Sequence, residues 1–116
     1  MVGATWNIGS GLVPALLSKG ADVRGLVHGE AQAQVVTDAG AEAVVGDLRK
    51  PETLDAPFEG VDAVYLLIRG KEDQVAMASA GIAAAWRSGS PRLVCHSAFV
   101  PEPAGDTFLG RQHAAI

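Results

Sequence analysis

A glycine-containing turn near the amino end limits the possible folds of this chain more than any other feature. Gly3 and Gly9 flank a short polar segment, and an apolar run with helical spacing follows between residues 12 and 17. This order predicts the end of a strand, a tight turn and the start of a helix. The first N–H groups of a helix lack partners within it, and together with the helix dipole they attract anions. The turn therefore predicts an anion site, whose usual ligand is the pyrophosphate of a dinucleotide.

One residue departs from this pattern. In a G-x-x-G-x-x-G turn the second glycine would fall where this chain has Trp6. That glycine lets the pyrophosphate approach the backbone, so an indole in its place must turn aside or block the site. Taken alone, the turn is equally consistent with a strand-to-helix connection that needs glycine only for its backbone angles.

Length and composition exclude several classes of protein. A chain of 116 residues forms at most one domain, 1–116, and with 48% hydrophobic residues it can bury a core. No apolar run approaches the ~20 residues that span a bilayer, and no signal peptide is recognisable. The single cysteine, Cys95, excludes an internal disulfide, so we expect a cytoplasmic protein. The net charge of −4 argues against a nucleic-acid partner, and the spacing of the histidines predicts no metal site.

Apolar periodicity predicts helices and strands in alternation along the rest of the chain. The predicted strands are 22–27, 43–45, 61–68 and 92–96, and the predicted helices are 10–19, 30–39, a short one from Pro51, and 72–87. A loop is predicted over 100–107 and a further helix from Phe108. Strict alternation predicts an α/β fold of the Rossmann-like kind, a doubly wound parallel sheet in a three-layer α/β/α arrangement.

The same patterns predict which residues are buried. Strands 43–45, 61–68 and 92–96 read as buried, with Cys95 as a small core residue. Pro14 should fall within or just after the first turn of its helix, where it is tolerated. On helix 72–87 we expect Met77 in the core, together with one stripe formed by Val75, Ser79, Ile82 and Trp86.

The first strand of the predicted sheet is largely missing. In a 3-2-1-4-5 strand order it would be central, yet only Met1 and Val2 precede the turn. We therefore expect a gap between strands 22–27 and 61–68, which the lack of a neighbour on the inner side of 22–27 would confirm. Because the sequence also stops as a helix begins, we expect that this is a partial chain or that something else fills the gap.

Four segments in this order resemble the NmrA-like group of atypical short-chain dehydrogenase/reductase proteins. They are the turn, the V-R-G-L-V-H strand, the G-D-L after the third strand and the segment G-V-D-A-V-Y-L-L. The likeness covers residues 2–116, about the N-terminal half of a family member. It implies an NAD(P)-binding Rossmann domain, with NADP slightly preferred to NAD, and reduction of a small organic substrate.

The resemblance also implies roles for individual residues at the carboxyl ends of the strands. The turn would bind the pyrophosphate, the end of strand 22–27 would bind the 2′-phosphate, the end of strand 43–45 the adenine, and the end of strand 61–68 the nicotinamide. The pyrophosphate residues would be Gly3, Thr5, Trp6, Asn7, Ile8 and Gly9, and the 2′-phosphate residue would be His28. The adenine residues would be Asp47 and Leu48, and the nicotinamide residues Leu67, Ile68 and Arg69. Ser97, after the fifth strand, is similar to the family's active-site serine region and is the catalytic candidate.

Several departures from the family pattern leave alternatives open. His28 stands where the family commonly has arginine, and the only tyrosine, Tyr65, lies within a strand and has no lysine four residues on. The Tyr-x-x-x-Lys proton-donor pair is therefore absent. A non-catalytic dinucleotide sensor and a truncated inactive chain are the alternatives. Asp47 could instead cap the helix that Pro51 begins, and His96 is expected to be hydrogen-bonded in place.

Overall fold

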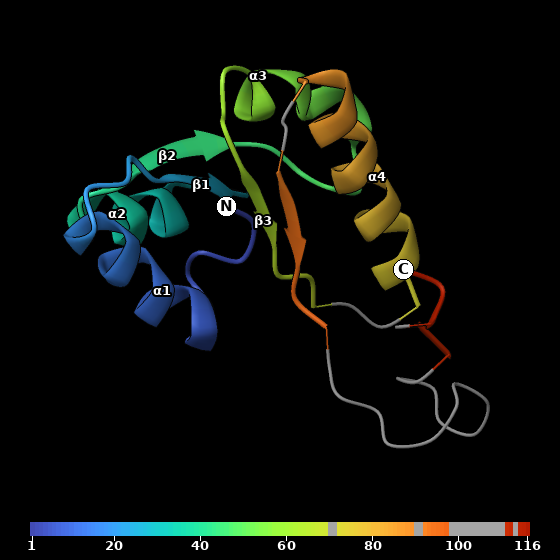
Figure 1. The fold of residues 1–116 in the computed structure, drawn as a ribbon, viewed down its shortest axis with the longest axis horizontal. Coiled ribbons are helices and arrows are strands. Elements are labelled where there is room, and N and C mark those ends of the chain that lie inside the picture. The colour runs from blue at the N-terminus through green and yellow to red at the C-terminus, as the bar shows by residue number, and fades with distance from the viewer. Residues whose placement is uncertain (70–71, 90–91, 98–110, 113) are drawn as a thin grey trace.

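The computed structural model describes residues 1–69, 72–89, 92–97, 111–112 and 114–116, and it shows an α/β fold (Figure 1). The elements in order are α1 (Asn7–Ser18), β1 (Arg24–Val27), α2 (Glu30–Asp38), β2 (Glu42–Val45), a 3₁₀ helix (Pro51–Thr53), α3 (Asp55–Phe58), β3 (Val64–Leu66), α4 (Gln74–Arg87) and β4 (Leu93–Cys95). Helices and strands alternate as predicted. The loop predicted over 100–107 and the start of the helix predicted from Phe108 lie outside the described residues. In the described part of the chain no helix combines the length and the apolar character needed to cross a bilayer.

All strand pairs are parallel. Arg24 of β1 pairs with Glu42 of β2, and Val64 of β3 pairs with Leu93 of β4. The two pairs of strands, β1–β2 and β3–β4, lie on either side of the amino terminus (Figure 1).

The gap expected in the middle of the sheet is absent, so that prediction was wrong. Val2 forms parallel bridges to both Leu26 and Leu66. Met1 faces β1, because its carbonyl accepts the Leu26 N–H at 2.9 Å, and Val2 faces β3, because its N–H donates to the Tyr65 carbonyl at 2.9 Å. In a parallel ladder successive residues bond to opposite neighbours, so two residues are enough to join both sides. We call Met1–Val2 the central rung, and the strand order is β2–β1–rung–β3–β4.

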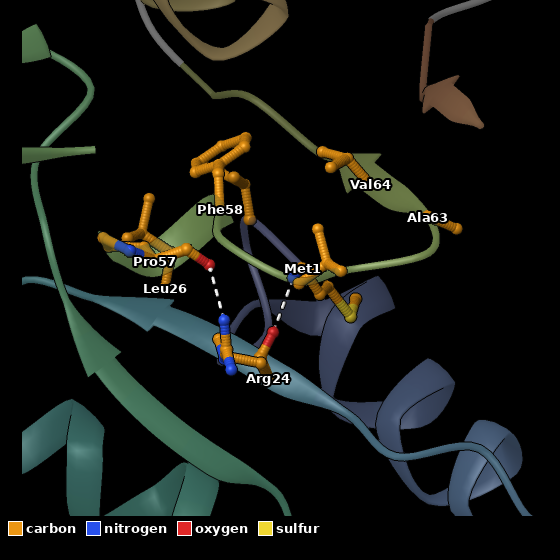
Figure 2. Close-up of a pocket in the computed structure, with 9 residues that line it drawn as sticks. Met1, Arg24, Leu26, Pro57, Phe58, Ala63 and Val64 are labelled. Carbon is orange, nitrogen blue, oxygen red and sulfur yellow. Dashed lines mark hydrogen bonds between the residues drawn. The ribbon is translucent and has the colours of Figure 1, made fainter. Parts of the chain in front are cut away.

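The Arg24 side chain helps to line a small pocket beside the central rung. Its guanidinium donates to the carbonyl oxygens of Pro57 at 3.3 Å and Glu59 at 2.8 Å, and it pairs with Glu42 at 2.7 Å. The α-amino group of Met1 donates to the Arg24 carbonyl at 2.5 Å (Figure 2). Burial of this amine, with the Arg24 charge nearby, lowers its pKa from 8.0 to about 6.

Two apolar clusters hold the helices on the sheet. The cluster around α3 and α4 is formed by Val2, Leu48, Leu54, Phe58, Val64, Leu66, Met77, Ala84 and Ala85. The cluster around α1 and α2 is formed by Ala4, Val13, Val23, Val27, Val36 and Ala41. The rung and the turn after it contribute to both, because Val2 belongs to the first cluster and Ala4 to the second.

The buried face of α4 differs from the predicted stripe. Met77 is 5% exposed, as predicted, but Trp86 is 86% exposed. The buried face consists of Gln74, Met77, Ala78, Gly81, Ala84 and Ala85. Small residues let the helix lie close to the sheet, since a Cβ at Gly81 would be 3.2 Å from a methyl carbon of Leu66. Trp86 would hold the two apart, and it points to solvent instead.

Three further burial predictions were wrong. Leu93, Val94 and Cys95 of β4 are all exposed, and β2 is exposed at both ends, with Val45 64% exposed. Within the described residues each of these strands pairs on one side only, which leaves its other side accessible.

The position of Pro14 also differs from the prediction, because α1 begins at Asn7 rather than Ser10. Pro14 therefore lies in the helix interior, where its missing N–H leaves the carbonyl of Ser10 without its usual partner. Both residues are on the exposed face of the helix, where water can reach that carbonyl.

Candidate functional site

Both glycines of the amino-terminal turn lie so close to other backbone atoms that a side chain would not fit. Gly3 has a φ of +78°, and a Cβ there would lie 2.7 Å from the carbonyl oxygen of Leu67, just past β3. A Cβ at Gly9 would lie 2.0 Å from the carbonyl oxygen of Gly3. Side chains at either position would separate the turn, the helix and the end of β3. The turn therefore brings the start of α1 directly against the carboxyl edge of the sheet.

The start of α1 has the features of an anion site. Trp6 is the N-cap residue and makes no side-chain cap hydrogen bond, and the first helical turn contains no acidic residue. The N–H groups of Asn7 and Ile8 have no carbonyl partner within the helix, because residues this close to a helix start cannot have one. Both residues are exposed. Negatively charged groups are favoured at such a position.

Trp6 fits the turn without strain. Its φ of −85° and ψ of 170° are extended values that any residue adopts, so the backbone does not require glycine here. Its N–H donates to the Gly3 carbonyl at 3.2 Å, and its own carbonyl accepts the Ser10 N–H at 2.7 Å. The side chain is half-buried and lines the cavity beside the helix start. Trp6 would therefore affect a bound ligand through the space that its side chain occupies.

A cavity of about 260 Å³ opens between the start of α1 and the ends of β3 and β4. Its walls are Trp6, Asn7, Ile8, Leu67, Ile68, Arg69, His96 and Ser97. All of these except His96 were predicted as site residues, and the fold brings them together from three separate segments. Gly3 and Gly9 form the backbone support behind this wall.

The other predicted site residues, Thr5, His28, Asp47 and Leu48, do not line this cavity. His28 follows β1, is exposed, and donates its backbone N–H to Gln32 Oε1 at 2.8 Å. Asp47 and Leu48 follow β2. All three therefore lie at the carboxyl ends of strands, further along the same sheet edge.

Asp47 does not cap the helix that begins at Pro51, which was the alternative reading of this residue. The N-cap position is Lys50, which makes no side-chain cap bond. Instead, Asp47 Oδ1 accepts the N–H of Arg49 at 2.9 Å, and the N–H of Asp47 donates to Thr53 Oγ1 at 2.9 Å. Leu48 is 5% exposed and packs in the cluster around α3 and α4. The turn after β2 is thus internally braced.

Sequence reasoning missed a side-chain pair at the cavity. The Tyr65 hydroxyl and His96 Nδ1 are hydrogen-bonded at 2.8 Å, with ring centroids 6.2 Å apart. His96 was expected to be hydrogen-bonded, but neither its partner nor its place on the cavity wall was predicted. Strand alternation alone did not reveal the pair, because the register between the two strands is also needed. In the β3–β4 register Tyr65 pairs with Val94, so Tyr65 and His96 point to the same face of the sheet.

The arrangement can bind a ligand that carries both phosphate and an apolar ring. Helix N–H groups and the exposed Arg69 guanidinium offer positive charge at the cavity wall. The side chains of Trp6, Leu67 and Ile68 offer apolar surface at the same wall. Among the residues that the structure describes, no three His, Cys, Asp or Glu side chains gather as metal ligands would.

Comparison with known proteins agrees with this geometry. A family model described as NAD(P)H-binding matches residues 3–113. An NAD(P)H azoreductase of Xenophilus azovorans is 34% identical over 111 residues, 96% of this chain and 39% of the relative.

Two solved structures share the fold. The triphenylmethane reductase of Citrobacter sp., complexed with NADP(H), superposes with a TM-score of 0.81 at 23% identity, over 98% of this chain and 41% of that chain. An NADPH-dependent quinone oxidoreductase of Escherichia coli, complexed with NADPH, superposes with a TM-score of 0.82 at 22% identity, again over 98% and 41%. The chain thus spans about two fifths of the length of these relatives.

Proposed function

This chain belongs to the NAD(P)H-binding family, and on that premise we propose that it forms the cofactor-binding part of a reductase that transfers hydride to a small conjugated organic acceptor. One observation carries the proposal. The anion-binding start of α1 and the apolar ends of β3 and β4 share a single cavity at the carboxyl edge of the sheet. Ligands of doubly wound sheets bind at this edge.

The described residues fit a dinucleotide that extends along the sheet edge. The N–H groups of Asn7 and Ile8 would hold the pyrophosphate, with Thr5 in the same turn. Leu67, Ile68 and Arg69 would line the nicotinamide end, and Ser97 would lie beside the reacting atoms. The adenosine end would run past β1 and β2, toward His28, Asp47 and Leu48. This placement follows the order β2–β1–rung–β3–β4, which puts the turn in the middle.

The class of acceptor is suggested by the relatives and by the cavity wall. Three relatives are named for reducing azo compounds, triphenylmethanes and quinones. All three classes are π-conjugated molecules that accept a hydride, and azo compounds and quinones need a proton as well to become stable products. The apolar wall that includes Trp6, Leu67 and Ile68 suits such a planar molecule.

We propose that the protein is located in the cytoplasm. We favour NADP over NAD as its cofactor. No carboxylate ends β1, where His28 and Gly29 follow Val27, so a 2′-phosphate would meet no like charge there. Glu30 comes only at the start of α2 and could reach a ribose hydroxyl. The discrimination between the two cofactors should therefore be small.

Calorimetric titration with NADPH and then NADH, on the wild type and on Trp6→Gly, tests the proposal. We expect the wild type to bind, with NADPH somewhat tighter, because Trp6 lies on the cavity wall in an unstrained conformation. Trp6→Gly should bind at least as tightly, since it removes bulk beside the helix start. Failure of both proteins to bind either cofactor would overturn the proposal.

The same samples separate a reductase from a sensor. Oxidation of NADPH in the presence of a quinone, an azo compound or a triphenylmethane supports the reductase. Tight binding without turnover on any of these acceptors would instead favour a dinucleotide sensor, the alternative that the absent Tyr-x-x-x-Lys pair leaves open.

A further inference from the structure

Reduction of a neutral acceptor by hydride transfer needs a proton as well as a hydride, and the usual tyrosine and lysine pair is absent. A quinone or an azo compound that gains a hydride becomes an anion, and it must then be protonated on oxygen or nitrogen. The cavity wall offers exchangeable protons on Trp6, Asn7, Arg69, His96 and Ser97. Imidazole is the one side chain among these types that readily changes charge between about pH 5 and 8.

The geometry holds the His96 ring by one nitrogen. Its backbone N–H donates to the Leu66 carbonyl at 2.8 Å, which fixes the residue at the end of β3. Its Nδ1 is 2.8 Å from the Tyr65 hydroxyl, which comes from the neighbouring strand on the same face. Because Nδ1 is engaged by tyrosine, Nε2 is the ring nitrogen that a ligand in the cavity can meet.

A tyrosine hydroxyl suits a histidine that must change its protonation state. When the ring is an imidazolium, Nδ1–H donates to the tyrosine oxygen and Nε2–H is available to the cavity. After Nε2 gives up its proton, the neutral ring keeps its proton on Nδ1 and keeps the same bond to Tyr65. The pair therefore passes through both states without rearrangement.

We propose that His96 is the proton donor of the reduction and that Tyr65 is its positioning residue; this rests on the proposed function. The acceptor gains a hydride from a dihydronicotinamide, which leaves as the oxidised nicotinamide, and it gains a proton from His96 Nε2. Water returns that proton to Nε2. Two electrons and two protons thus reach the acceptor, and the protein ends in its starting state.

The kinetic test uses the purified protein with NADPH and a water-soluble para-benzoquinone. We expect His96→Asn to lower the rate of NADPH oxidation by about 10²-fold while the cofactor dissociation constant stays within about twofold, since general acids act on the barrier and not on cofactor binding. It should also change the dependence of the rate on pH, because a proton donor must carry its proton when the acceptor is reduced.

Two further variants check specificity. Tyr65→Phe should lower the rate less, by about tenfold, and shift the pH profile, because it removes the partner of Nδ1 and leaves Nε2 in place. Cys95→Ser is the matched control, since Cys95 adjoins His96, is exposed, and points to the opposite face of β4. Its rate and pH profile should equal those of the wild type.

A measurement independent of turnover uses the ¹⁵N resonances of the histidine rings in the NADP⁺-loaded protein. Adding the hydroquinone product should shift Nε2 of His96 and leave both nitrogens of His28 unchanged. Tyr65→Phe should shift Nδ1 of His96 before any ligand is added. This measurement tests the role of His96 even if the chain binds cofactor without oxidising NADPH.

The outcomes are distinguishable. Absence of cofactor binding to both the wild type and Trp6→Gly overturns the proposed function itself, and where only Trp6→Gly binds, the His96 and Tyr65 variants are compared in that background. If the wild type binds and oxidises NADPH, a His96→Asn protein with the wild-type rate and pH profile overturns only the role of His96. If the wild type binds cofactor but does not oxidise NADPH, a His96 Nε2 resonance that does not shift on addition of the hydroquinone overturns the role of His96. Loss of cofactor binding by His96→Asn would also contradict a role confined to the proton.

Discussion

At the scale of single residues, the site depends on the absence of side chains at Gly3 and Gly9. Neither residue contributes a functional group, yet a Cβ at either would lie within 2.7 Å of a backbone oxygen. The absence of side chains lets α1 start against the sheet and places Trp6 on the cavity wall. The glycine that the sequence lacks, at position 6, is the one whose conformation the structure does not require.

Gly9→Ala should lower the free energy of unfolding by about 2–3 kcal/mol, because its Cβ would overlap the Gly3 carbonyl and force the helix from the turn. Gly11→Ala, two residues along the same helix, is the matched control. A Cβ there meets nothing within 4 Å, so this change should stabilise the protein by about 0.5–1 kcal/mol. Urea unfolding of both variants makes the measurement, and equal effects would contradict the account of the turn.

At the scale of elements, helix α4 shows where periodicity is insufficient. Its predicted stripe and its real buried face both have helical spacing, since alanines occupy positions all round the helix. Side-chain volume decides between them. The sheet accepts the face of alanines and Gly81, while Trp86 lies in solvent.

Met77→Ala should cost about 2–4 kcal/mol of stability, because it opens a cavity in the cluster around α3 and α4. Trp86→Ala should change stability by no more than about 0.5 kcal/mol, as expected for an exposed residue. Thermal unfolding of both variants tests this contrast. A larger loss at Trp86 than at Met77 would show that the predicted stripe is the buried one after all.

Much of the fold and part of the site could be predicted from the sequence. The turn and the alternation of elements follow from local patterns, and seven of the eight cavity residues are among those that the family resemblance implied. The central rung could not be predicted, because two residues carry no periodicity and act only through hydrogen bonds to distant strands. The Tyr65–His96 pair was missed for a related reason, since it depends on the register between two strands.

At the scale of the whole molecule, the central rung joins two groups of elements. One group contains β1, β2, α1 and α2, and the other contains β3, β4, α3 and α4, each with its own apolar cluster. The carbonyl of Met1 bonds to the first group and the N–H of Val2 to the second. The amino group of Met1 lies in this junction, close to the Arg24 side chain (Figure 2).

Stability should therefore rise with pH between about 6 and 8. The pKa of the Met1 amine is about 6 in the folded chain and 8.0 when the amine is free, so in this window the unfolded chain binds more protons. Below this pH window the folded chain buries a charged ammonium, at a cost of about 2–3 kcal/mol for a pKa shift of this size. Urea unfolding at a series of pH values measures the slope. The Nα-acetylated chain is the control, because it keeps the histidines and loses the amine, and an equal slope there would refute the assignment.

The central rung also determines when the sheet can close during synthesis. Met1 and Val2 leave the ribosome before β1, which reaches them soon afterwards. The residues that flank Val2 on its other side, Tyr65 and Leu67, emerge only after α1, β1, α2, β2 and α3 have been made. A nascent chain that contains every element up to α3 therefore still has one open side at its centre, which β3 must fill before the two groups become one sheet.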